Sequence, residues 1–336
     1  MQRGKIATGI DSKGVGNRKM PNRYSGKDIA ILVPTKDRPD NMKKLLDSFA
    51  QQTVQCGRII VVASGMNIEE VVMGYVDRLK VSYHCCPLPG QIRQRNMGIG
   101  LLDDSTPLVG FFDDDIVLEH DAVERMLESW NQTGPNTAGI ACNITNAPAW
   151  SPNLLKIIFG IGGMNPGKIM KSGRATSLCN VSSDIQTDWL PGGVTFWRQD
   201  VIKEFHHKEI DTRRAIMEDV YFSYPIGKKY DLFVCHQSRV RHEHTFVPSN
   251  KSTEYTFYGF VETVMGIHFV GRHRELSFLW FIWMTLGFIA SDLMKGILSG
   301  DKQMFYRAKG RTQGLLLWLK MHPARENTSE LLKTLN

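Results

Sequence analysis

The sequence predicts an α/β fold built on a mostly parallel sheet flanked by helices. Short continuous apolar runs recur from Ile29 onward, and stretches with apolar residues at i, i+3, i+4 and i+7 lie between them. Parallel strands need long crossover connections, which are usually helices. A group of carboxylates directly follows one apolar run, as is typical of the edge where such a sheet binds ligands. Together these features indicate parallel strands with right-handed crossovers.

The first strand and helix begin where the composition changes at Asp28. Ile29–Val33 is a continuous apolar run, Pro34–Pro39 has the composition of a turn, and the apolar positions of residues 42–49 share one helical face. Further strands are expected at 59–62, 81–83, 108–112, 138–142, 194–197, 231–235 and 238–241. Further helices are expected at 68–79, 91–102, 121–130 and 217–226.

Length and composition limit the class of protein. A chain of 336 residues with 42% hydrophobic residues can form one large domain with appendages. The six cysteines include no Cys-x-x-Cys pair, so a zinc knuckle or a disulfide framework is not expected and a reducing cytosol is favoured.

Residues 143–188, which contain Pro148, Pro152, Pro166 and several glycines, are expected to form loops and edge elements. The segment is long enough for a functional insertion.

The net charge of +7 is unevenly distributed. Residues 1–27 carry seven Lys or Arg and one Asp, hence +6, and they lack apolar periodicity, which is typical of a flexible arm. Residues 271–336 carry ten Lys or Arg and five Asp or Glu, hence +5, so the remainder carries −4. No nucleic-acid-binding motif accompanies the basic flanks, so an anionic membrane surface is the expected partner and solubilising tails are the alternative.

Residues 246–336 are expected to form a helical C-terminal region. Within it, Leu276–Ser291 contains 16 residues without a charge, whereas a bilayer span needs about 20. A second apolar patch at 314–319 precedes Lys320. The two segments form either a monotopic membrane anchor or a buried helical pair that closes the domain.

Three consecutive carboxylates, Asp113, Asp114 and Asp115, follow the apolar run 108–112. At the carboxyl end of a buried strand these carboxylates repel one another unless a cation or hydrogen-bond donors offset the repulsion. A hard divalent cation that also binds substrate phosphates is suited to this place. The triplet therefore indicates a metal-dependent enzyme acting on a phosphorylated donor, and a solvated turn or structural cation site is the alternative.

Six segments resemble, in the same order, the inverting GT-A glycosyltransferases of family 2, many of which are bacterial enzymes of cell-surface polysaccharide synthesis. The resemblance implies a Rossmann-like GT-A domain over residues 28–245, with a nucleotide-binding half at 28–115 and an acceptor-binding half at 116–245. It also implies a divalent cofactor, Mn²⁺ or Mg²⁺. The segments are Ile31–Pro39, Gly90–Ile99, Phe111–Asp115, Trp189–Gly193, Met217–Val220 and Val240–His242.

By this resemblance, Asp115 and Asp113 ligate the metal, and Asp113 or Asp114 contacts the ribose of the donor. His242 is expected as a further metal ligand, with His244 as the alternative, since both would lie on one face of a strand; a structural histidine remains an alternative to both. The metal would stabilise the departing nucleoside diphosphate as a Lewis acid.

The other donor contacts are expected after the first two strands and on the third helix. Arg93 and Arg95 point to different helix faces, and the family pattern selects Arg95. Where the family commonly has an aspartate that reads uracil, this chain has Ser64, a departure that leaves uridine and thymidine both open. The resemblance favours a UDP-sugar, and a dTDP-sugar is the alternative. A helix-capping loop is the alternative for the first-strand residues. The expected donor-binding residues are Pro34, Thr35, Asp37, Arg38, Ser64, Arg95, Asp113 and Asp114.

Inversion requires one in-line displacement, in which a single carboxylate takes the proton of the acceptor hydroxyl. The resemblance assigns this role to Asp219 and an acceptor contact to Glu218; an acidic first helical turn is the alternative reading of the pair. Trp189 is expected to stack on an acceptor sugar beside Gly192 and Gly193, unless it belongs to the core.

The sequence therefore predicts a glycosyltransferase on the cytoplasmic face of a membrane. It would move a sugar from a nucleoside diphosphate to a carbohydrate acceptor that is lipid-linked, and no nucleic-acid partner is expected. One alternative is a sugar-phosphate nucleotidyltransferase, although residues 34–38 lack the glycines of a phosphate-binding loop. The other is a catalytically inactive, membrane-peripheral binding module.

Overall fold

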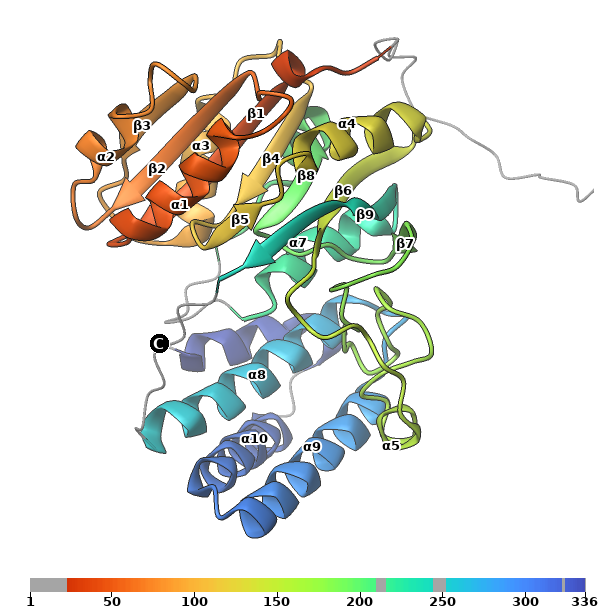
Figure 1. Ribbon diagram of the computed structural model, residues 1–336. Helices are drawn as coiled ribbons and strands as arrows, with labels where there is room; N and C mark the ends of the chain where they lie inside the picture. Colours follow the sequence, from red (N-terminus) through yellow and green to blue (C-terminus); the bar gives the residue numbers. More distant parts are fainter. Residues whose placement is uncertain (1–22, 210–215, 244–251, 322–323, 336) are drawn as a thin grey trace, which may run out of the picture.

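The computed structural model describes residues 23–209, 216–243, 252–321 and 324–335. A curled sheet with helices on both faces forms one part of the molecule, and a group of C-terminal helices lies against one end of it (Figure 1). This arrangement confirms the predicted α/β fold with a helical C-terminal region. Residues 1–22 of the predicted basic arm, and His244, lie outside the described residues.

The described strands form one sheet in the order β3-β2-β1-β4-β8-β6-β9-β5, and β7 pairs with β9 outside this path. β1 is parallel to β2 and β4, β2 is parallel to β3, and β6 is parallel to β9, whereas β8 runs antiparallel to both of its neighbours. The strands are β1 Ile29–Lys36, β2 Arg58–Ser64, β3 Val81–Cys85, β4 Leu108–Phe112, β5 Ile116–Leu118, β6 Thr137–Ile144, β7 Ile185–Thr187, β8 Val194–Arg198 and β9 Asp231–His242.

The aspartate triplet forces the sheet to curl. β4 and β5 are four strand positions apart in the sheet, which in a flat sheet would be roughly 19 Å. Only residues 113–115 connect them, and that connection reaches at most about 14 Å. The far edge, β9 with β5, therefore bends back toward the carboxyl end of β4, and the three aspartates lie at the corner.

Alternate residues of the central strands face two different cores. Ile29, Ile31 and Val33 of β1 pack with helices α1, α2 and α4 on one face, while Ala30 and Leu32 pack with α3, α6 and α7 on the other. Strands buried on both faces read as continuous apolar runs, which is why the strand predictions succeeded. The helices are α1 Pro39–Ala50, α2 Glu69–Met73, α3 Gln91–Gly100, α4 Ala122–Gln132, α5 Leu154–Ile158, α6 Gln199–Phe205 and α7 Glu218–Gly227.

The C-terminal region consists of α8 Ser252–Arg272, α9 Phe278–Ser299, α10 Lys302–Met321 and the 3-10 helix η2 Arg325–Leu335. Its own core continues into the α/β part, because Val220 and Tyr224 of α7 pack in the same cluster as residues of α8, α9 and η2. α8 and α10 approach closely at Gly310, where a Cβ atom would lie 1.9 Å from the carbonyl oxygen of Thr256.

Several element predictions need correction. The expected strand pair 231–235 and 238–241 is one strand, β9, whose register with β6 shifts after Cys142. The helix expected at 68–79 ends at Met73, and residues 34–36 continue β1 instead of forming a turn. The short helix α6 was not predicted. Residues 143–188 are mostly irregular, as expected: β6 ends at Ile144, and beyond it only α5 and β7 are helix or strand.

One helix of the described chain, Phe278–Ser299, is long and apolar enough to cross a membrane by length and composition. It extends beyond the uncharged segment to include Asp292 and Lys295. Only 33% of its most apolar window is buried inside the protein, so α9 is not a fully buried core helix.

Candidate active site

The carboxyl ends of β1, β2 and β4 meet at one edge of the sheet, because β1 is parallel to both of its neighbours. Two of the predicted residues are in direct contact there. The Thr35 hydroxyl at the end of β1 donates a 2.6 Å hydrogen bond to Asp114, which follows β4, and Asp114 is only 5% exposed. Burial raises the pKa of Asp114 even though Thr35 and Arg38 oppose that shift.

Arg38 lies between two of the aspartates. Its Nη1 atom is 3.0 Å from Asp114 Oδ1 and 3.4 Å from Asp115 Oδ2. The guanidinium is therefore a donor that offsets the repulsion between these two neighbouring carboxylates.

Asp115 faces the curled-back edge of the sheet. Its Oδ1 atom lies 3.0 Å from Nε2 of His242, the last residue of β9, and β5 pairs with β9 so that Ile116 is in register with His242. Burial acts to raise the pKa of Asp115, but the hydrogen bond and charge of His242 outweigh it and lower that pKa. For His242, burial acts to lower the pKa. The hydrogen bond and charge of Asp115 outweigh burial, so the pKa of His242 is raised.

The residues at this corner suit a divalent cation. In the described ranges, no three or more His, Cys, Asp or Glu side chains are grouped as a metal site. Asp115 and His242 are nevertheless adjacent, and Mg²⁺-type ions are usually held by one or two protein carboxylates together with water and substrate phosphates. Imidazole is a ligand that also suits manganese. Two protein ligands with room for phosphate oxygens therefore fit such an ion.

Asp113 points away from this pair. Its Oδ1 atom accepts hydrogen bonds from Gln91 Nε2 at 2.6 Å and from Arg95 Nη2 at 2.8 Å. At Gly193 a Cβ atom would lie 2.1 Å from Asp113 Oδ2, so the glycine leaves the space that the carboxylate occupies. The structure thus brings Asp115 and His242 together, but it places Asp113 with Arg95.

Arg95 is buried in the middle of the site, with 1% of its surface exposed. Its Nε and Nη1 atoms have no hydrogen-bond partner among the described residues. A Cβ atom at Gly192 would lie 2.8 Å from Arg95 Nη1 and 2.1 Å from Asp219 Oδ1. The two consecutive glycines therefore let the backbone pass between Arg95, Asp113 and Asp219.

Glu218 and Asp219 begin α7, directly after Met217, which adopts a left-handed conformation with φ of 64°. Burial, together with the charge of Asp219, raises the pKa of Glu218 to about 7. Burial also raises the pKa of Asp219, against the charge of Arg95. Non-glycine residues rarely adopt positive φ, and such positions are common at functional sites. A buried carboxyl with a pKa of about 7, as Glu218 has, is able to accept a proton near neutral pH.

The other predicted donor residues lie near the same strand ends. Asp37, with φ of 56°, accepts a 2.6 Å hydrogen bond from the backbone N–H of Met66 and so links the loops after β1 and β2. Ser64 ends β2 and is buried, and its hydroxyl has no partner among the described residues. Pro34 is buried within β1, in register with Val62.

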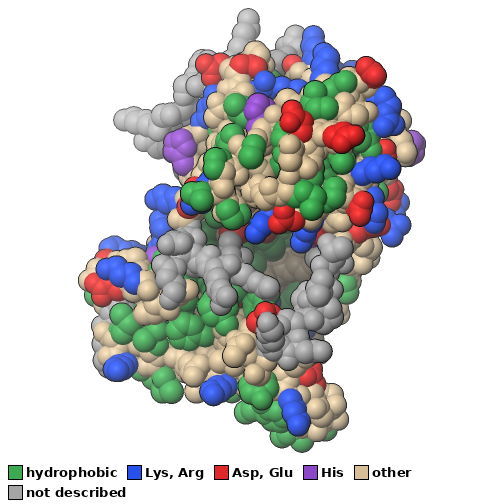
Figure 2. All heavy atoms as spheres, turned by 90° about the vertical axis from the view of Figure 1, so that its left-hand side faces the viewer, with side chains coloured by type: hydrophobic (Ala, Val, Ile, Leu, Met, Phe, Trp, Pro, Cys, Tyr) green, Lys and Arg blue, Asp and Glu red, His purple; other side chains and the backbone are tan. Residues whose placement is uncertain are grey.

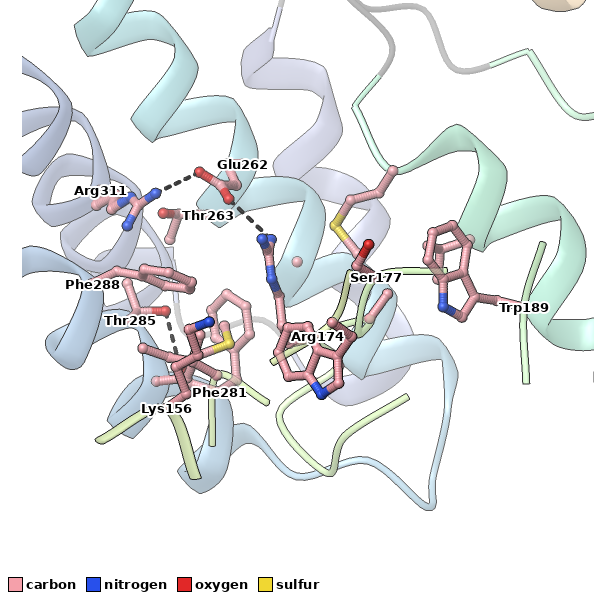
Figure 3. A pocket seen from close by; sticks show the side chains of 18 residues that line it. Lys156, Arg174, Ser177, Trp189, Glu262, Thr263, Phe281, Thr285, Phe288 and Arg311 are labelled. Carbon is pink, nitrogen blue, oxygen red and sulfur yellow. Dashed lines mark hydrogen bonds and ion pairs between the residues drawn. The ribbon is translucent and has the colours of Figure 1, made fainter. Parts of the chain in front are cut away.

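Trp189 does not share a cavity with Glu218. It lines one end of a cavity of about 490 Å³ that extends between α8, α9 and the 150–177 segment, and its indole N–H donates to the carbonyl of Thr176. Glu262 lies at the other end and binds Arg174 and Arg311 (Figure 3). Glu218 faces a second cavity on the other side of α7.

Sequence reasoning missed two residues of the site. Gln91 contacts Asp113, and the signal was available, because Gln91 and Arg95 are four residues apart and share a helix face. Arg93 faces elsewhere and pairs with Glu209 at 2.7 Å, as the choice of Arg95 implied. His207, whose ring stacks on Phe111, has no signal in the sequence.

Comparisons with known proteins agree with this geometry. The model of glycosyl transferase family 2 matches residues 30–181, slightly less than half of the chain, and includes the aspartate triplet. The chain is thus similar to glycosyl transferase family 2 over these residues. No curated protein matches the sequence.

Solved structures with a similar fold include a mannosyltransferase. The mannosyltransferase PcManGT from Pyrobaculum calidifontis, in complex with GDP-Man and Mn²⁺, has a TM-score of 0.55 at 10% identity, over 90% of this chain and 91% of that chain. S. aureus TarS has a TM-score of 0.48 at 11% identity over 84% and 54%, and TarS 1-349 has 0.46 at 12% over 88% and 92%. The PcManGT similarity confirms the GT-A fold of this glycosyltransferase, and the TarS similarities are too low to add to it.

Proposed function

We propose that this glycosyltransferase depends on Mn²⁺ or Mg²⁺, inverts the anomeric configuration, and transfers one sugar from a nucleoside diphosphate to a carbohydrate acceptor. The catalytic unit is residues 28–245. The acceptor is lipid-linked and belongs to cell-surface polysaccharide synthesis, at the cytoplasmic face of a membrane. A buried arginine between two carboxylate groups is the observation that carries this proposal.

The two carboxylate groups suit two different tasks. Asp115, beside His242, has a lowered pKa and stays ionised, which suits a cation ligand. Glu218 and Asp219 have raised pKa values, which suits a proton acceptor. Arg95 separates the groups, bound to Asp113 on one side and adjacent to Asp219 on the other. Carboxylates with opposite pKa shifts support the division into metal site and base.

In the proposed mechanism, Asp115 and His242 hold the cation, and Thr35 and Arg38 fix Asp114 beside it for the donor ribose. The bound cation would stabilise the charge that develops on the departing diphosphate. Asp113, oriented by Arg95 and Gln91, faces the interior of the site for the donor. Ser64 ends the adjacent strand, where its hydroxyl is available to the donor base.

Asp219 removes the proton from the acceptor hydroxyl, and the backbone at Gly192 orients the Asp219 carboxylate. Glu218 hydrogen-bonds the acceptor, since it lines a cavity and its Oε2 atom has no partner among the described residues. A pKa of about 7 would also suit Glu218 itself as base. Separate substitution of the two carboxylates distinguishes these roles.

Exposed apolar residues on α5 and α9 support membrane association. The two helices are joined, because the Trp283 indole N–H donates to the carbonyl of Ile158 and its ring stacks on Phe159. Leu279 and Leu298, at opposite ends of α9, are 75% and 80% exposed. Figure 2 shows hydrophobic side chains gathered on the C-terminal helices. Exposed lysines of α9 and α10, Lys295, Lys302, Lys309 and Lys320, would favour anionic lipid.

A donor panel tests the enzymatic part. The purified chain is incubated with UDP-, dTDP- and GDP-sugars and Mn²⁺ or Mg²⁺, and release of nucleoside diphosphate is measured. GDP-sugars are included because PcManGT was solved with GDP-Man. We expect one base to be preferred, and we expect Asp219→Asn to lower turnover by at least about 100-fold. The exposed Asp77→Asn is the matched control.

Three results would contradict this proposal: undiminished turnover in EDTA, turnover of Asp219→Asn within about tenfold of wild type, or a product that retains the donor's anomeric configuration. If Glu218→Gln abolishes turnover and Asp219→Asn does not, the base is Glu218.

Flotation with phosphatidylglycerol vesicles tests the membrane part. We expect the double variant Leu279→Asp, Leu298→Asp to lose vesicle binding, because both side chains would need to enter the lipid interface. Val76→Asp, an exposed apolar residue outside the C-terminal region, is the control and should bind like wild type. Equal flotation of all three proteins would reject membrane association through α9.

A further inference from the structure

A second cavity of about 520 Å³ lies between the α/β part and the C-terminal region. Glu218, Tyr221, Phe222 and Pro225 of α7 form one of its walls, and they are spaced i, i+3, i+4 and i+7, so they share one helix face. The opposite walls come from the segment after α6, the end of α8 and η2. Its volume is in the range of small-molecule sites.

Three cations line this cavity. Lys208, Arg272 and Lys333 come from three different walls, and all three are exposed. In the part of the chain that the structure describes, none of them is paired with a carboxylate, whereas Glu209, on the same wall as Lys208, is already bound to Arg93 at 2.7 Å. Their charge is thus available to a ligand.

The inner wall carries buried hydrogen-bonding groups that have no partner in the described part of the chain. His207 is 5% exposed, and neither ring nitrogen has a hydrogen-bond partner among the described residues. Burial and the charge of Arg95 lower its pKa to about 3, so the ring stays neutral, with one donor and one acceptor. Glu218 Oε2 is similarly unpartnered. Buried polar atoms without hydrogen bonds cost free energy, so binding of a polar ligand that forms these hydrogen bonds would be favoured.

We propose that this cavity binds the acceptor, and that the acceptor carries an anionic group, a phosphate or a carboxylate, held by Arg272, Lys333 and Lys208. This inference rests on the proposed function. The acceptor hydroxyls lie against Glu218 and His207, and the anionic group lies toward the three cations. The C-terminal region then contributes to acceptor specificity as well as to membrane binding, because Arg272 and Lys333 belong to it.

The test is direct binding, measured without transfer. Inorganic phosphate and glucuronate are titrated calorimetrically into the full chain in saturating nucleoside diphosphate and Mn²⁺, so that the donor site is filled. We expect one anion to bind, and we expect Arg272→Gln with Lys333→Gln to weaken it by about tenfold or more. Arg274→Gln is the matched control, an exposed arginine two residues away that does not line the cavity.

A spectroscopic readout locates the bound anion. His268 and His273 line the same cavity, so their ring signals in ¹³C-histidine NMR should shift with the anion, while those of the exposed His120, outside the cavity, should not. Stronger binding of phosphate identifies a phosphorylated acceptor, and stronger binding of glucuronate identifies a sugar acid.

Three outcomes would overturn the inference: no binding of either anion to wild type, equal weakening by Arg274→Gln, or binding only when nucleoside diphosphate is absent. The last outcome would mean that the three cationic side chains bind the donor instead of the acceptor. Failure of the proposed function gives a different pattern, since a chain that hydrolyses no nucleotide sugar would still show anion binding and histidine shifts at this cavity.

Discussion

Glu218→Gln should stabilise the protein at alkaline pH, and the size of the gain follows from its burial. The pKa of Glu218 rises from 4.5 to about 7 in the folded state. A shift of about 2.5 units at 1.36 kcal/mol per unit corresponds to about 3 kcal/mol. Because the folded-state pKa lies above the unfolded one, the ionised wild type is penalised as pH rises from 4.5 through 7, and below 4.5 the penalty is absent.

Glutamine cannot ionise, so the variant escapes this penalty. We expect the free energy of unfolding of Glu218→Gln to exceed that of wild type by about 3 kcal/mol at pH 8.5 and by about a quarter of that at pH 5. Urea unfolding followed by tryptophan fluorescence, in EDTA, measures both values. Glu330→Gln, at an exposed position, should change stability by less than about 0.5 kcal/mol at either pH.

The reasoning is refuted if Glu218→Gln has the same effect at both pH values, or if it destabilises the protein at pH 8.5. The first result would mean that the carboxyl is not buried from solvent in the folded protein. The second would mean that an unrecognised cation holds it in the ionised form.

Further predictions concern the glycine, the buried arginine and the histidine. Gly192→Ala should lower kcat by about 100-fold, because a Cβ atom would lie 2.1 Å from Asp219 Oδ1 and displace it; a kcat within threefold of wild type would contradict this. Arg95→Met should cost about 3 kcal/mol in urea unfolding at pH 7, because it leaves Asp113 without the Arg95 counter-charge and with only the neutral Gln91 as a side-chain donor among the described residues; a loss under about 1 kcal/mol would show that Asp113 is solvated. His242→Gln should destabilise the metal-free protein most near pH 5.5. The folded-state pKa of His242 is raised, so the stabilisation that its charge provides is complete below pH 6.5 and is lost as the pH rises through the folded-state pKa. Urea midpoints at pH 5.5 and 9 measure this, and an equal loss at both would indicate a role independent of the histidine charge.

Much of the sheet could be predicted because its strands are buried on both faces. Val33 and Phe112 stand in uninterrupted apolar runs, so both strands could be located from sequence, and with them the edge where Thr35 and Asp114 lie, although β1 continues to Lys36 instead of ending at Val33. The expected helix at 68–79 was too long because turns after Met73 still bury Tyr75 and Leu79. Buried apolar spacing alone does not distinguish a helix from a series of turns.

The orientation of side chains within the site could not be predicted in the same way. Asp113 and Asp115 face different partners because the sheet curls after β4 and because Gly193 makes room beside Asp113, and both causes lie outside the triplet. The cavity beside Glu218 is lined by residues that lie far apart in the sequence, such as His207 and Arg272. No local pattern encodes such contacts.

The position of α9 also depended on its surroundings. Its composition was equally consistent with a buried helix or with a membrane-facing one. Its neighbours leave Leu279 and Leu298 uncovered, which a composition count cannot reveal. Residues 271–336 include Arg272 and residues of η2 that line the proposed acceptor cavity, so deleting them would not test membrane binding alone.

The buried guanidinium of Arg95 makes the two halves of the site respond to one another. It is the shared electrostatic neighbour of Asp113, Glu218, Asp219 and His207. If a donor draws Asp113 away, the guanidinium is left with a weaker counter-charge and favours ionisation of Glu218 and Asp219 more strongly. If the base is Asp219 or Glu218, as proposed, binding of the donor would then favour the ionised base, and addition of donor before acceptor would be a consequence of this one side chain.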